Sequence, residues 1–355
     1  MRVAIVGCGG IAHTHAASCR AMPEVDLVAL VDLRPEALAE FGKAFAVPSN
    51  GHFTDYMAMY EVVRPDIVAV CTRPAQHHGP TVAALERGIH VLCEKPIALD
   101  LVQADEMIAV SEGTGAKLAI NTQRHTDPVY RHAVRLVRDG IMGELRAVRS
   151  ECKTYRAGYS MVDIGSHYLD AMSLFAGDPS WVFGHITNAD GEDITSKDVE
   201  EGERDSGLVA GDRCTIQIGY RGGVMGISEY WVGTATFGFE VVGSRGAMTI
   251  RRDDSEVMVT KGGGGKARDA IVWEPVEVPL TDDEKRSLEA AGRWSTVNMM
   301  RSLIRAIGED SRPACSGYDG RAALEIVMAT YTSQKTGARA RLPLADRKHP
   351  LGEWK

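Results

Sequence analysis

The sequence predicts an α/β protein in which a parallel-sheet domain precedes an α+β domain with a large, open, mainly antiparallel sheet. At 355 residues the chain is too long for one ordinary core and suits about two domains. Up to residue 122, short apolar runs alternate with helical patterns, as in βαβ units. Beyond it, strand-like runs follow one another through glycine-rich turns. We therefore place the domains at 1–122 and 123–355, and the final segment could pack back on the first domain.

The first domain contains five apolar runs that predict strands, at 3–6, 25–31, 66–71, 89–93 and 118–120. Helical spacing of apolar residues predicts helices at 35–45, 81–87 and 101–111, and at 128–138 beyond the boundary. Gly88, Gly113 and Gly140 stand where three of these helices would end.

The second domain has strand-like runs at 145–153, 214–220, 224–231, 237–243, 247–251 and 257–260. Helices are predicted at 163–175, 296–307 and 321–330, which makes this domain a layered α+β structure. The acidic, poorly periodic stretch 186–213 predicts an irregular excursion. The glycine run 262–265 predicts a hairpin tip rather than a phosphate site, because no helix follows it.

Composition favours a small-molecule partner. Hydrophobic content of 44% and charged content of 25% are typical of a soluble globular protein. The net charge of -8 argues against nucleic acid or an anionic membrane as the main partner. The sequence shows no signal-peptide pattern and no span-length apolar run, so we expect a cytoplasmic protein. Its seven scattered cysteines never form Cys-x-x-Cys, which predicts reduced, mostly structural thiols.

A glycine-rich turn, Gly7-Cys8-Gly9-Gly10-Ile11-Ala12, follows the first predicted strand and opens a helical segment. In that context a glycine string predicts a dinucleotide site. Gly7 permits the tight turn, Gly9 lets the backbone approach a pyrophosphate, and Ala12 allows the helix to pack on the strand. The helix N-terminus then offers its N–H groups to the anion.

Asp32 ends the second predicted strand, where a carboxylate accepts hydrogen bonds from the ribose hydroxyls of NAD and repels a 2′-phosphate. Arg34 could contact the adenine ring or, alternatively, a 2′-phosphate. We predict NAD as the cofactor, with NADP as the alternative.

The segment Glu94-Lys95-Pro96 interrupts an apolar run abruptly. Pro96 disfavours helical backbone at Lys95 and cannot donate a ladder hydrogen bond, so the strand must end with its last side chains aimed outward. In an open α/β sheet, ligands bind at such strand ends. The alternative is a solvated ion pair in a loop.

Asp163 and His167 are four residues apart, which places both on one face if the stretch is helical. Histidine exchanges protons near neutral pH, and a lysine can hydrogen-bond an alkoxide on a carbon that is losing hydride. Lys95, Asp163 and His167 could therefore carry out alcohol oxidation. Alternatively, Asp163 is a helix cap and His167 a buried packing residue.

A metal site is a further alternative for a carboxylate and histidine pair. No third ligand recurs at a suitable spacing, and His13 and His15 lie in the predicted nucleotide helix. We therefore predict no metal.

Four motifs together resemble the glucose-fructose oxidoreductase, inositol dehydrogenase and rhizopine catabolism (Gfo/Idh/MocA) family. They are the glycine-rich turn, Thr72-Arg73-Pro74-Ala75-Gln76-His77, Glu94-Lys95-Pro96 and Asp163-x-x-x-His167. The match covers nearly the whole chain and continues through segments 121–124, 140–143, 242–246 and 316–320.

The resemblance implies an N-terminal Rossmann domain and a C-terminal domain whose open sheet often mediates homodimers or homotetramers. It implies that Lys95 and His167 are the acid/base residues, oriented or tuned by Asp163. His167 would accept the proton of a sugar, inositol or polyol hydroxyl while Lys95 hydrogen-bonds the same oxygen and hydride passes to the nicotinamide C4. With the resemblance, the predicted cofactor-binding residues are Gly7, Gly9, Gly10, Ile11, Ala12, Asp32, Arg34, Thr72, His77, Glu94 and Lys95. For His77, which would line the nicotinamide pocket, a structural role at a helix start is the alternative.

The sequence departs from many relatives at 157–162, where a glycine-rich stretch is common, so the choice of sugar stays open. Predicted substrate-facing residues are Lys95, Arg124, His125, Tyr155, Arg156, Tyr159, Asp163 and His167. The arginines could recognise a carboxylate or another anion by bidentate hydrogen bonds.

Three functions remain open at this point. A dehydrogenase would release NADH in proportion to product. A glycoside-cleaving enzyme of the same superfamily would oxidise its sugar transiently and give no net NADH. A sugar or nucleotide sensor would keep the fold without turnover, which the presence of Lys95, Asp163 and His167 disfavours.

Overall fold

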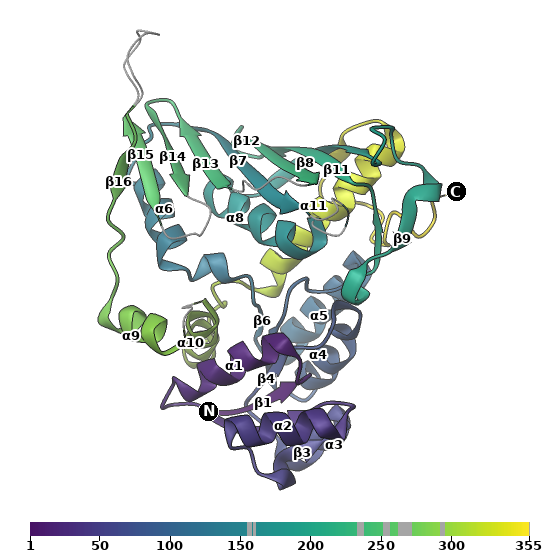
Figure 1. Ribbon diagram of the computed structural model, residues 1–355, viewed down its shortest axis with the longest axis vertical. Coiled ribbons are helices and arrows are strands. Elements are labelled where there is room, and N and C mark those ends of the chain that lie inside the picture. The colour runs from purple at the N-terminus through teal and green to yellow at the C-terminus, as the bar shows by residue number, and fades with distance from the viewer. Residues whose placement is uncertain are drawn as a thin grey trace. The chain divides into compact units, whose positions relative to one another are not determined.

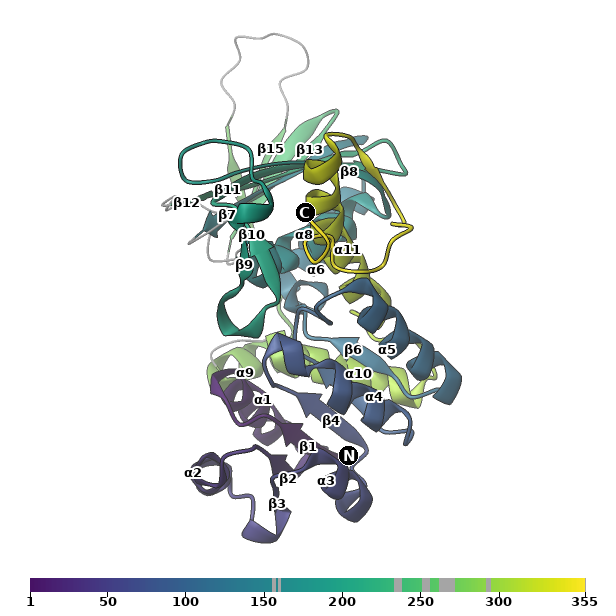
Figure 2. The ribbon, with the colours of Figure 1, turned by 90° about the vertical axis from the view of Figure 1, so that its right-hand side faces the viewer.

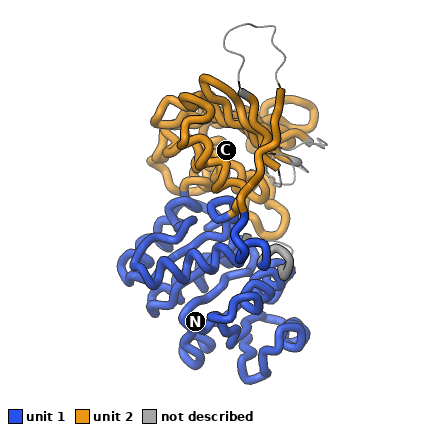
Figure 3. Tube along the Cα trace, turned by 90° about the vertical axis from the view of Figure 1, so that its left-hand side faces the viewer, with its two compact units in different colours: residues 1–126, 280–321 blue, residues 127–279, 322–355 orange. Residues whose placement is uncertain are grey.

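The computed structural model describes residues 1–154, 158, 161–232, 238–250, 256–261, 272–291 and 295–354. The chain forms two compact units (Figure 3). Unit 1 comprises Met1–Thr126 and Leu280–Arg321, and unit 2 comprises Asp127–Pro279 and Ala322–Lys355. Among the described residues, no helix is both long enough and apolar enough to span a membrane.

Unit 1 contains a six-stranded parallel sheet in the order β3-β2-β1-β4-β5-β6 (Figure 1). Its strands are β1 (Arg2–Val6), β2 (Asp26–Val31), β3 (His52–Phe53), β4 (Ile67–Val70), β5 (His90–Cys93) and β6 (Leu118–Ile120). The central strands read as continuous apolar runs because both faces of the sheet are covered. The strand order reverses between β1 and β4, and ligands of such sheets bind outside the carboxyl ends at this switch point.

Helices cover both faces of this sheet (Figure 2). One face carries α1 (Gly10–Arg20) and α2 (Pro35–Phe45), which contact each other through His13 and Phe41, with ring centroids 4.7 Å apart. The other face carries α3 (Tyr56–Val63), α4 (His78–Leu85) and α5 (Leu101–Thr114). Among the described residues of this unit, the 3₁₀ helices are η1 (Ser49–Gly51), η2 (Pro74–Gln76) and η3 (Gln123–His125).

An internal segment, and not the final one, completes unit 1. This segment contains α9 (Asp282–Ala291) and α10 (Ser295–Gly308), and α10 packs on α1. Ser316 forms a β-bridge with Ala119, and the Ile120 N–H donates to the Cys315 carbonyl at 3.0 Å. The segment therefore covers the edge strand β6, whereas the final residues belong to unit 2.

Unit 2 is built on a nine-stranded sheet in the order β16-β15-β14-β13-β7-β12-β11-β8-β17. Its strands are β7 (Leu145–Thr154), β8 (Pro179–Thr187), β11 (Arg213–Tyr220), β12 (Met225–Val232), β13 (Gly238–Gly243), β14 (Gly246–Ile250), β15 (Val257–Lys261), β16 (Glu274–Val276) and β17 (Ala340–Arg341). The β7 and β12 pair is parallel and the other described pairs are antiparallel. Together with the parallel sheet of unit 1, this confirms the predicted fold class.

Helices α6 (Pro128–Arg138), α8 (Ser166–Ala176) and α11 (Gly317–Thr336) accompany the sheet. Pro128 opens α6 behind Asp127, whose carboxylate accepts from the Val129 N–H at 2.8 Å. Helix α8 packs on β7 and β12 and follows a π-helix, η4 (Met161–Gly165). The predicted helix at 163–175 is therefore present, but its first turn is π-helical.

The stretch 186–213 is more ordered than predicted. It contains an antiparallel pair, β9 (Val199–Glu201) and β10 (Leu208–Ala210), flanked by the 3₁₀ helices η5 (Ser196–Asp198) and η6 (Glu203–Asp205). A capping box between Thr195 and Asp198 fixes the start of η5 with two short hydrogen bonds to the Asp198 carboxylate. The glycine run predicted as a hairpin tip, 262–265, lies outside the described residues.

Candidate functional site

The turn between β1 and α1 has the geometry that a dinucleotide requires. Gly7 has φ +93°, and a Cβ there would lie 2.9 Å from the Cys71 carbonyl and the Thr72 nitrogen. At Gly9 and Gly10 an added Cβ would meet nothing within 4 Å, so the backbone there is open to a ligand. Helix α1 begins at Gly10 and presents its free N–H groups at this opening.

Two more residues of the turn, Ala12 and Ile11, differ in burial. Ala12 is fully buried, which lets α1 pack on the sheet, whereas Ile11 is exposed. Cys8 is buried, and burial raises the pKa of its thiol to about 12, so the thiol stays protonated at neutral pH.

Asp32 is held directly after β2 by hydrogen bonds from the turn. Its Oδ2 accepts from the Cys8 N–H at 2.9 Å, and its Oδ1 accepts from the Arg34 N–H at 3.0 Å. The Arg34 Nε lies 3.3 Å from the same oxygen, and the Arg34 side chain is 63% exposed. A carboxylate thus stands beside the glycine-rich turn where a ribose would bind, which fits NAD.

His77 joins the ends of β4 and β5. Its Nδ1 lies 2.8 Å from the Pro96 carbonyl oxygen, and its Nε2 lies 3.1 Å from the Thr72 carbonyl oxygen. The side chain is 1% exposed, and burial lowers its pKa below the ordinary value although both carbonyls act in the opposite direction. His77 also precedes α4, so the structural alternative describes its contacts, while its role in lining a nicotinamide pocket stays a prediction.

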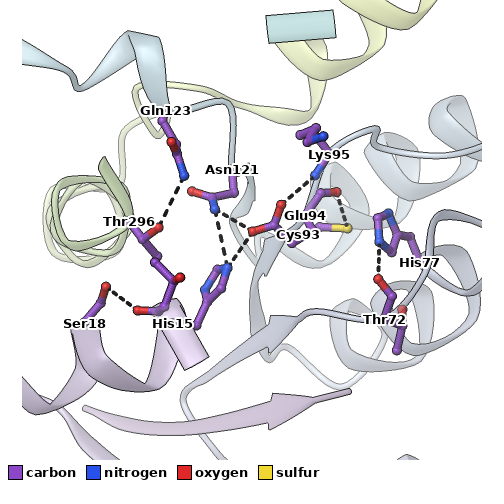
Figure 4. A network of polar contacts seen from close by, with 11 residues as sticks. His15, Ser18, Thr72, His77, Cys93, Glu94, Lys95, Asn121, Gln123 and Thr296 are labelled. Carbon is purple, nitrogen blue, oxygen red and sulfur yellow. Dashed lines mark hydrogen bonds and ion pairs between the residues drawn. The ribbon is translucent and has the colours of Figure 1, made fainter. Parts of the chain in front are cut away.

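Glu94, directly after β5, lies in a buried polar network with His15 and Asn121 (Figure 4). Its Oε1 accepts from the His15 Nε2 at 2.7 Å and from the Asn121 Nδ2 at 2.6 Å. Burial acts to raise the pKa of the Glu94 carboxyl, but the His15 hydrogen bond and charge, with Asn121 and Lys95, outweigh it and lower the pKa below its ordinary value. Glu94 is therefore a buried carboxylate at neutral pH.

Lys95 is half-buried and follows Glu94 at the end of the sheet. The carbonyl of Pro96, the next residue, is the one that His77 contacts. Arg124 and His125 lie on η3 of the same unit and are half-buried, and neighbouring Gln123 reaches Thr296 of α10 with its amide at 3.5 Å. Unit 1 thus carries the predicted cofactor-binding residues together with Lys95 and Arg124.

The predicted proton-exchanging pair lies in unit 2. Asp163 is in the π-helix η4, His167 is in the first turn of α8, and both are half-buried. The N-cap of α8 is Gly165 and has no side-chain cap hydrogen bond, so Asp163 is not the helix cap. π-helical turns of this kind are frequent at functional sites.

Close packing fixes this turn on the sheet of unit 2. A Cβ at Gly165 would lie 2.5 Å from the hydroxyl oxygen of Tyr230, a fully buried residue of β12. The Ser166 hydroxyl donates to the Asp163 carbonyl at 2.9 Å. A larger residue than glycine at position 165 would force the turn or Tyr230 to shift. Three predicted substrate-facing residues, Tyr155, Arg156 and Tyr159, lie outside the described residues.

Sequence reasoning missed the roles of His15 and Asn121. The sequence shows His15 only as half of a His-x-His pair and Asn121 only as part of a family motif. Their partner Glu94 is 79 and 27 residues away in the chain, respectively. The signal that could have found His15 is its place in a helix that runs directly after the glycine-rich turn and faces the sheet.

Comparison with known proteins identifies both parts of the chain. Residues 1–122 match the model of an oxidoreductase family with an NAD-binding Rossmann fold, and residues 136–342 match the C-terminal alpha/beta domain of the same family, Gfo/Idh/MocA. A D-apiose dehydrogenase of Paraburkholderia graminis is 24% identical over 98% of this chain and 91% of its own length. A myo-inositol 2-dehydrogenase of Thermotoga maritima is 23% identical over 94% of this chain and 96% of its own. The structure of a levoglucosan dehydrogenase in complex with NADH superposes with a TM-score of 0.78 at 17% identity, covering 97% of this chain and 99% of that one.

Proposed function

Because this chain belongs to the Gfo/Idh/MocA family of NAD-binding oxidoreductases, we propose that it oxidises a hydroxyl of a sugar, inositol or related polyol with NAD. The observation that carries the proposal is the position of Lys95 at the carboxyl end of β5. Its backbone N–H donates to the buried carboxylate of Glu94, and the carbonyl of the next residue, Pro96, contacts His77. The names of the full-length relatives, which act on apiose and myo-inositol, support the class of substrate.

The residues of unit 1 fit NAD. The N–H groups at the start of α1 and the open space at Gly9 and Gly10 would hold the pyrophosphate, and Asp32 would accept from the ribose hydroxyls. The same carboxylate would repel a 2′-phosphate, which favours NAD over NADP. When bound, NAD would supply the hydride acceptor.

The chain's own residues would handle the proton. Lys95, as an ammonium, would hydrogen-bond the substrate oxygen and stabilise negative charge as it develops there. His167 would accept the hydroxyl proton at an imidazole nitrogen, and Asp163, four residues earlier, would orient or tune that imidazole. In the reverse direction, His167 would return the proton to the oxygen. Arg124, Tyr155, Arg156 and Tyr159 would contribute to the choice of substrate.

We also propose that the sheet of unit 2 mediates a homodimer or homotetramer of this protein in the cytoplasm. Strand β12 supports this, since it exposes two large apolar side chains, Met225 at 36% and Trp231 at 44%. Sedimentation equilibrium of the purified chain and of Trp231→Glu tests the assembly, and a monomeric native protein would contradict it.

One experiment tests the enzymatic proposal. A panel of sugars, polyols and glycosides is incubated with NAD or NADP, and reduced cofactor and product are followed separately. We expect NADH and an oxidised product in equal amounts from at least one sugar or polyol. Lys95→Met and His167→Asn should each lower kcat by about 10²–10⁴-fold, while the Kd for NAD stays within about threefold.

Other results would contradict the proposal in distinct ways. Cleavage of a glycoside without net NADH would indicate the redox-neutral reaction. Binding of a sugar without consumption would indicate a sensor. Full activity in Lys95→Met with unchanged NAD affinity would remove Lys95 from the catalytic residues.

A further inference from the structure

We propose that Glu94, His15 and Asn121 form a buried positioning unit for Lys95, in which the Glu94 carboxylate fixes the turn after β5 instead of binding the cofactor. Such a role rests on the proposed function, since Lys95 is catalytic only there. The family resemblance places Glu94 among the cofactor-binding residues, so the two assignments of this carboxylate differ and can be separated by experiment.

All hydrogen bonds of the Glu94 side chain point inward. Oε1 accepts from His15 at 2.7 Å and from Asn121 at 2.6 Å, and Oε2 accepts from the Lys95 N–H at 3.3 Å (Figure 4). Glu94 is 6% exposed, Asn121 is 1% exposed and His15 is fully buried. Three of the roughly four acceptor positions of this carboxylate are therefore occupied from inside the protein, and only one position on Oε2 is left for a ribose hydroxyl.

The three residues also connect neighbouring structural elements. His15 comes from the second turn of α1, Glu94 from the end of β5 and Asn121 from the end of β6. The Asn121 N–H donates to the Cys93 carbonyl at 2.8 Å, which continues the β5–β6 ladder up to the turn. One buried anion, the Glu94 carboxylate, therefore accepts hydrogen bonds from the nucleotide helix, from the edge of the sheet and from the backbone N–H of Lys95.

The proton arrangement in this network is determined by its chemistry. An ionised carboxylate only accepts hydrogen bonds, so His15 must carry a proton on Nε2 and Asn121 must turn its amide nitrogen toward Glu94. Among the described residues, neither the His15 Nδ1 nor the Asn121 Oδ1 has a hydrogen-bond partner. The network is thus organised around the charge of Glu94, and that charge lies next to Lys95, whose ammonium it attracts.

Histidine substitutions can separate a specific hydrogen bond from simple burial. The Nε of glutamine can occupy the position of the histidine Nε2, whereas the asparagine nitrogen stops at the position of Nδ1. His15→Gln keeps a donor for Glu94, and His15→Asn loses it while remaining polar. Glu94→Gln removes the charge at constant shape, and His13→Asn on the same helix is the matched control, because exposed His13 lies outside the network.

The variants are compared by kcat, KM and NAD affinity on the substrate that the panel identifies. We expect His15→Asn and Glu94→Gln to lower kcat by about 10–100-fold, with KM and the Kd for NAD within about threefold of the native values. His15→Gln should recover most of the kcat lost in His15→Asn. A raised Kd for NAD at unchanged kcat in Glu94→Gln would make Glu94 a cofactor ligand and overturn the proposal, and equal losses in His15→Gln and His15→Asn would also overturn it.

A second measurement does not depend on turnover. Acetic anhydride acetylates lysine amines, and peptide mass spectrometry gives the relative rate at Lys95 in each folded variant. In Glu94→Gln the loss of the neighbouring charge should raise the acetylation rate at Lys95 at least about threefold. The rate at Lys95 should also change in His15→Asn, whereas it should change little in His15→Gln or His13→Asn. If no panel compound is oxidised, the proposed function fails while this rate still tests the unit, and equal rates in all variants would overturn the unit alone.

Discussion

The turn of unit 1 that carries Lys95 and the turn of unit 2 that carries Asp163 and His167 are fixed by different interactions. Around Lys95, buried side chains bond to each other and to the backbone, through the carboxylate of Glu94 and the imidazole of His77. In unit 2, the π-helix reaches β12 so closely that Gly165 leaves no room for a methyl group. Substitutions that change charge or hydrogen bonding should therefore act on the first turn, and those that change size on the second.

The largest expected effect on the cofactor site lies outside these two turns, in the glycine-rich turn of unit 1 that precedes α1. Gly7→Ala places a Cβ at φ +93° and 2.9 Å from the Cys71 carbonyl. We expect a loss of about 1–3 kcal/mol of stability from the strained backbone. The strained turn would also displace the backbone N–H groups that are proposed to hold the pyrophosphate, so the Kd for NAD should rise at least about tenfold, which corresponds to about 1.4 kcal/mol. Thermal melts and calorimetric NAD titrations measure the two effects.

Gly9 supplies the matched comparison, because its Cβ would point into open space. Gly9→Ala should weaken NAD binding while leaving the melting temperature nearly unchanged. Gly113→Ala, in α5 and also facing open space, controls for the general effect of alanine on helix stability. Native NAD affinity in Gly7→Ala would show that this turn is not the dinucleotide site.

An effect of similar size, on kcat instead of NAD affinity, is expected from the steric side of the comparison. Gly165→Ala would bring a methyl group to 2.5 Å from the Tyr230 hydroxyl, so the π-helix or β12 must move. Overpacking of this kind costs about 1–3 kcal/mol of stability. Displacement of His167 should lower kcat about tenfold or more, with the Kd for NAD unchanged.

A compensating substitution sharpens this result. Tyr230→Leu removes the ring that the methyl group would meet, so Gly165→Ala combined with Tyr230→Leu should recover part of the lost kcat. No recovery in the double variant, or a change in NAD affinity in Gly165→Ala, would mean that the turn is not positioned by this contact.

The sequence predicts the local geometry of the strand ends in unit 1 better than that of the turn that carries Asp163 and His167, for a physical reason. The glycine-rich turn, Asp32 and Lys95 are recognised from local rules, because strand ends, positive φ and proline restrict the backbone over a few residues. The partners of Glu94 come from distant parts of the chain, and spacing carries no information about such contacts. Asp163 and His167 were recognised as a pair at helical spacing, but the π-helical first turn depends on the packing of Gly165 against a strand 65 residues later.

The same reasoning explains the missed elements. Strand β8 alternates between buried and less buried residues, but Trp181, Val182 and Phe183 are all apolar, so the alternation does not show in the sequence. Strands β3 and β17 have two residues each and exist only because a neighbouring strand pairs with them. Long periodic elements such as α2 and α6 were predicted with their observed bounds.

The smallest expected effect is a pH dependence that belongs to the hydrogen-bonded turn. Burial lowers the pKa of His77, so an unfolded chain binds a proton at this residue at a higher pH than the folded protein does. Stability should therefore fall as the pH drops below about 6.5, the ordinary value for histidine. The pKa of the Glu94 carboxyl is also lowered, so this carboxylate stabilises the fold at pH values above its ordinary pKa of 4.5. That stabilisation is lost as the pH falls below 4.5.

Urea denaturation between pH 7.5 and 5 measures the first of these losses. His77→Asn keeps a nitrogen at the position of Nδ1 for the Pro96 carbonyl but cannot titrate, so the fall in stability over this range should be smaller than in the native protein. Each unit of pKa lowering corresponds to about 1.4 kcal/mol, which sets the scale of the difference. His78→Asn is the matched control, because His78 directly follows His77 but is partly exposed and bonds to Glu106 at 2.9 Å. An unchanged slope in His77→Asn would show that the buried histidine does not titrate differently in the folded chain, and the contrast between the two turns would then rest on geometry alone.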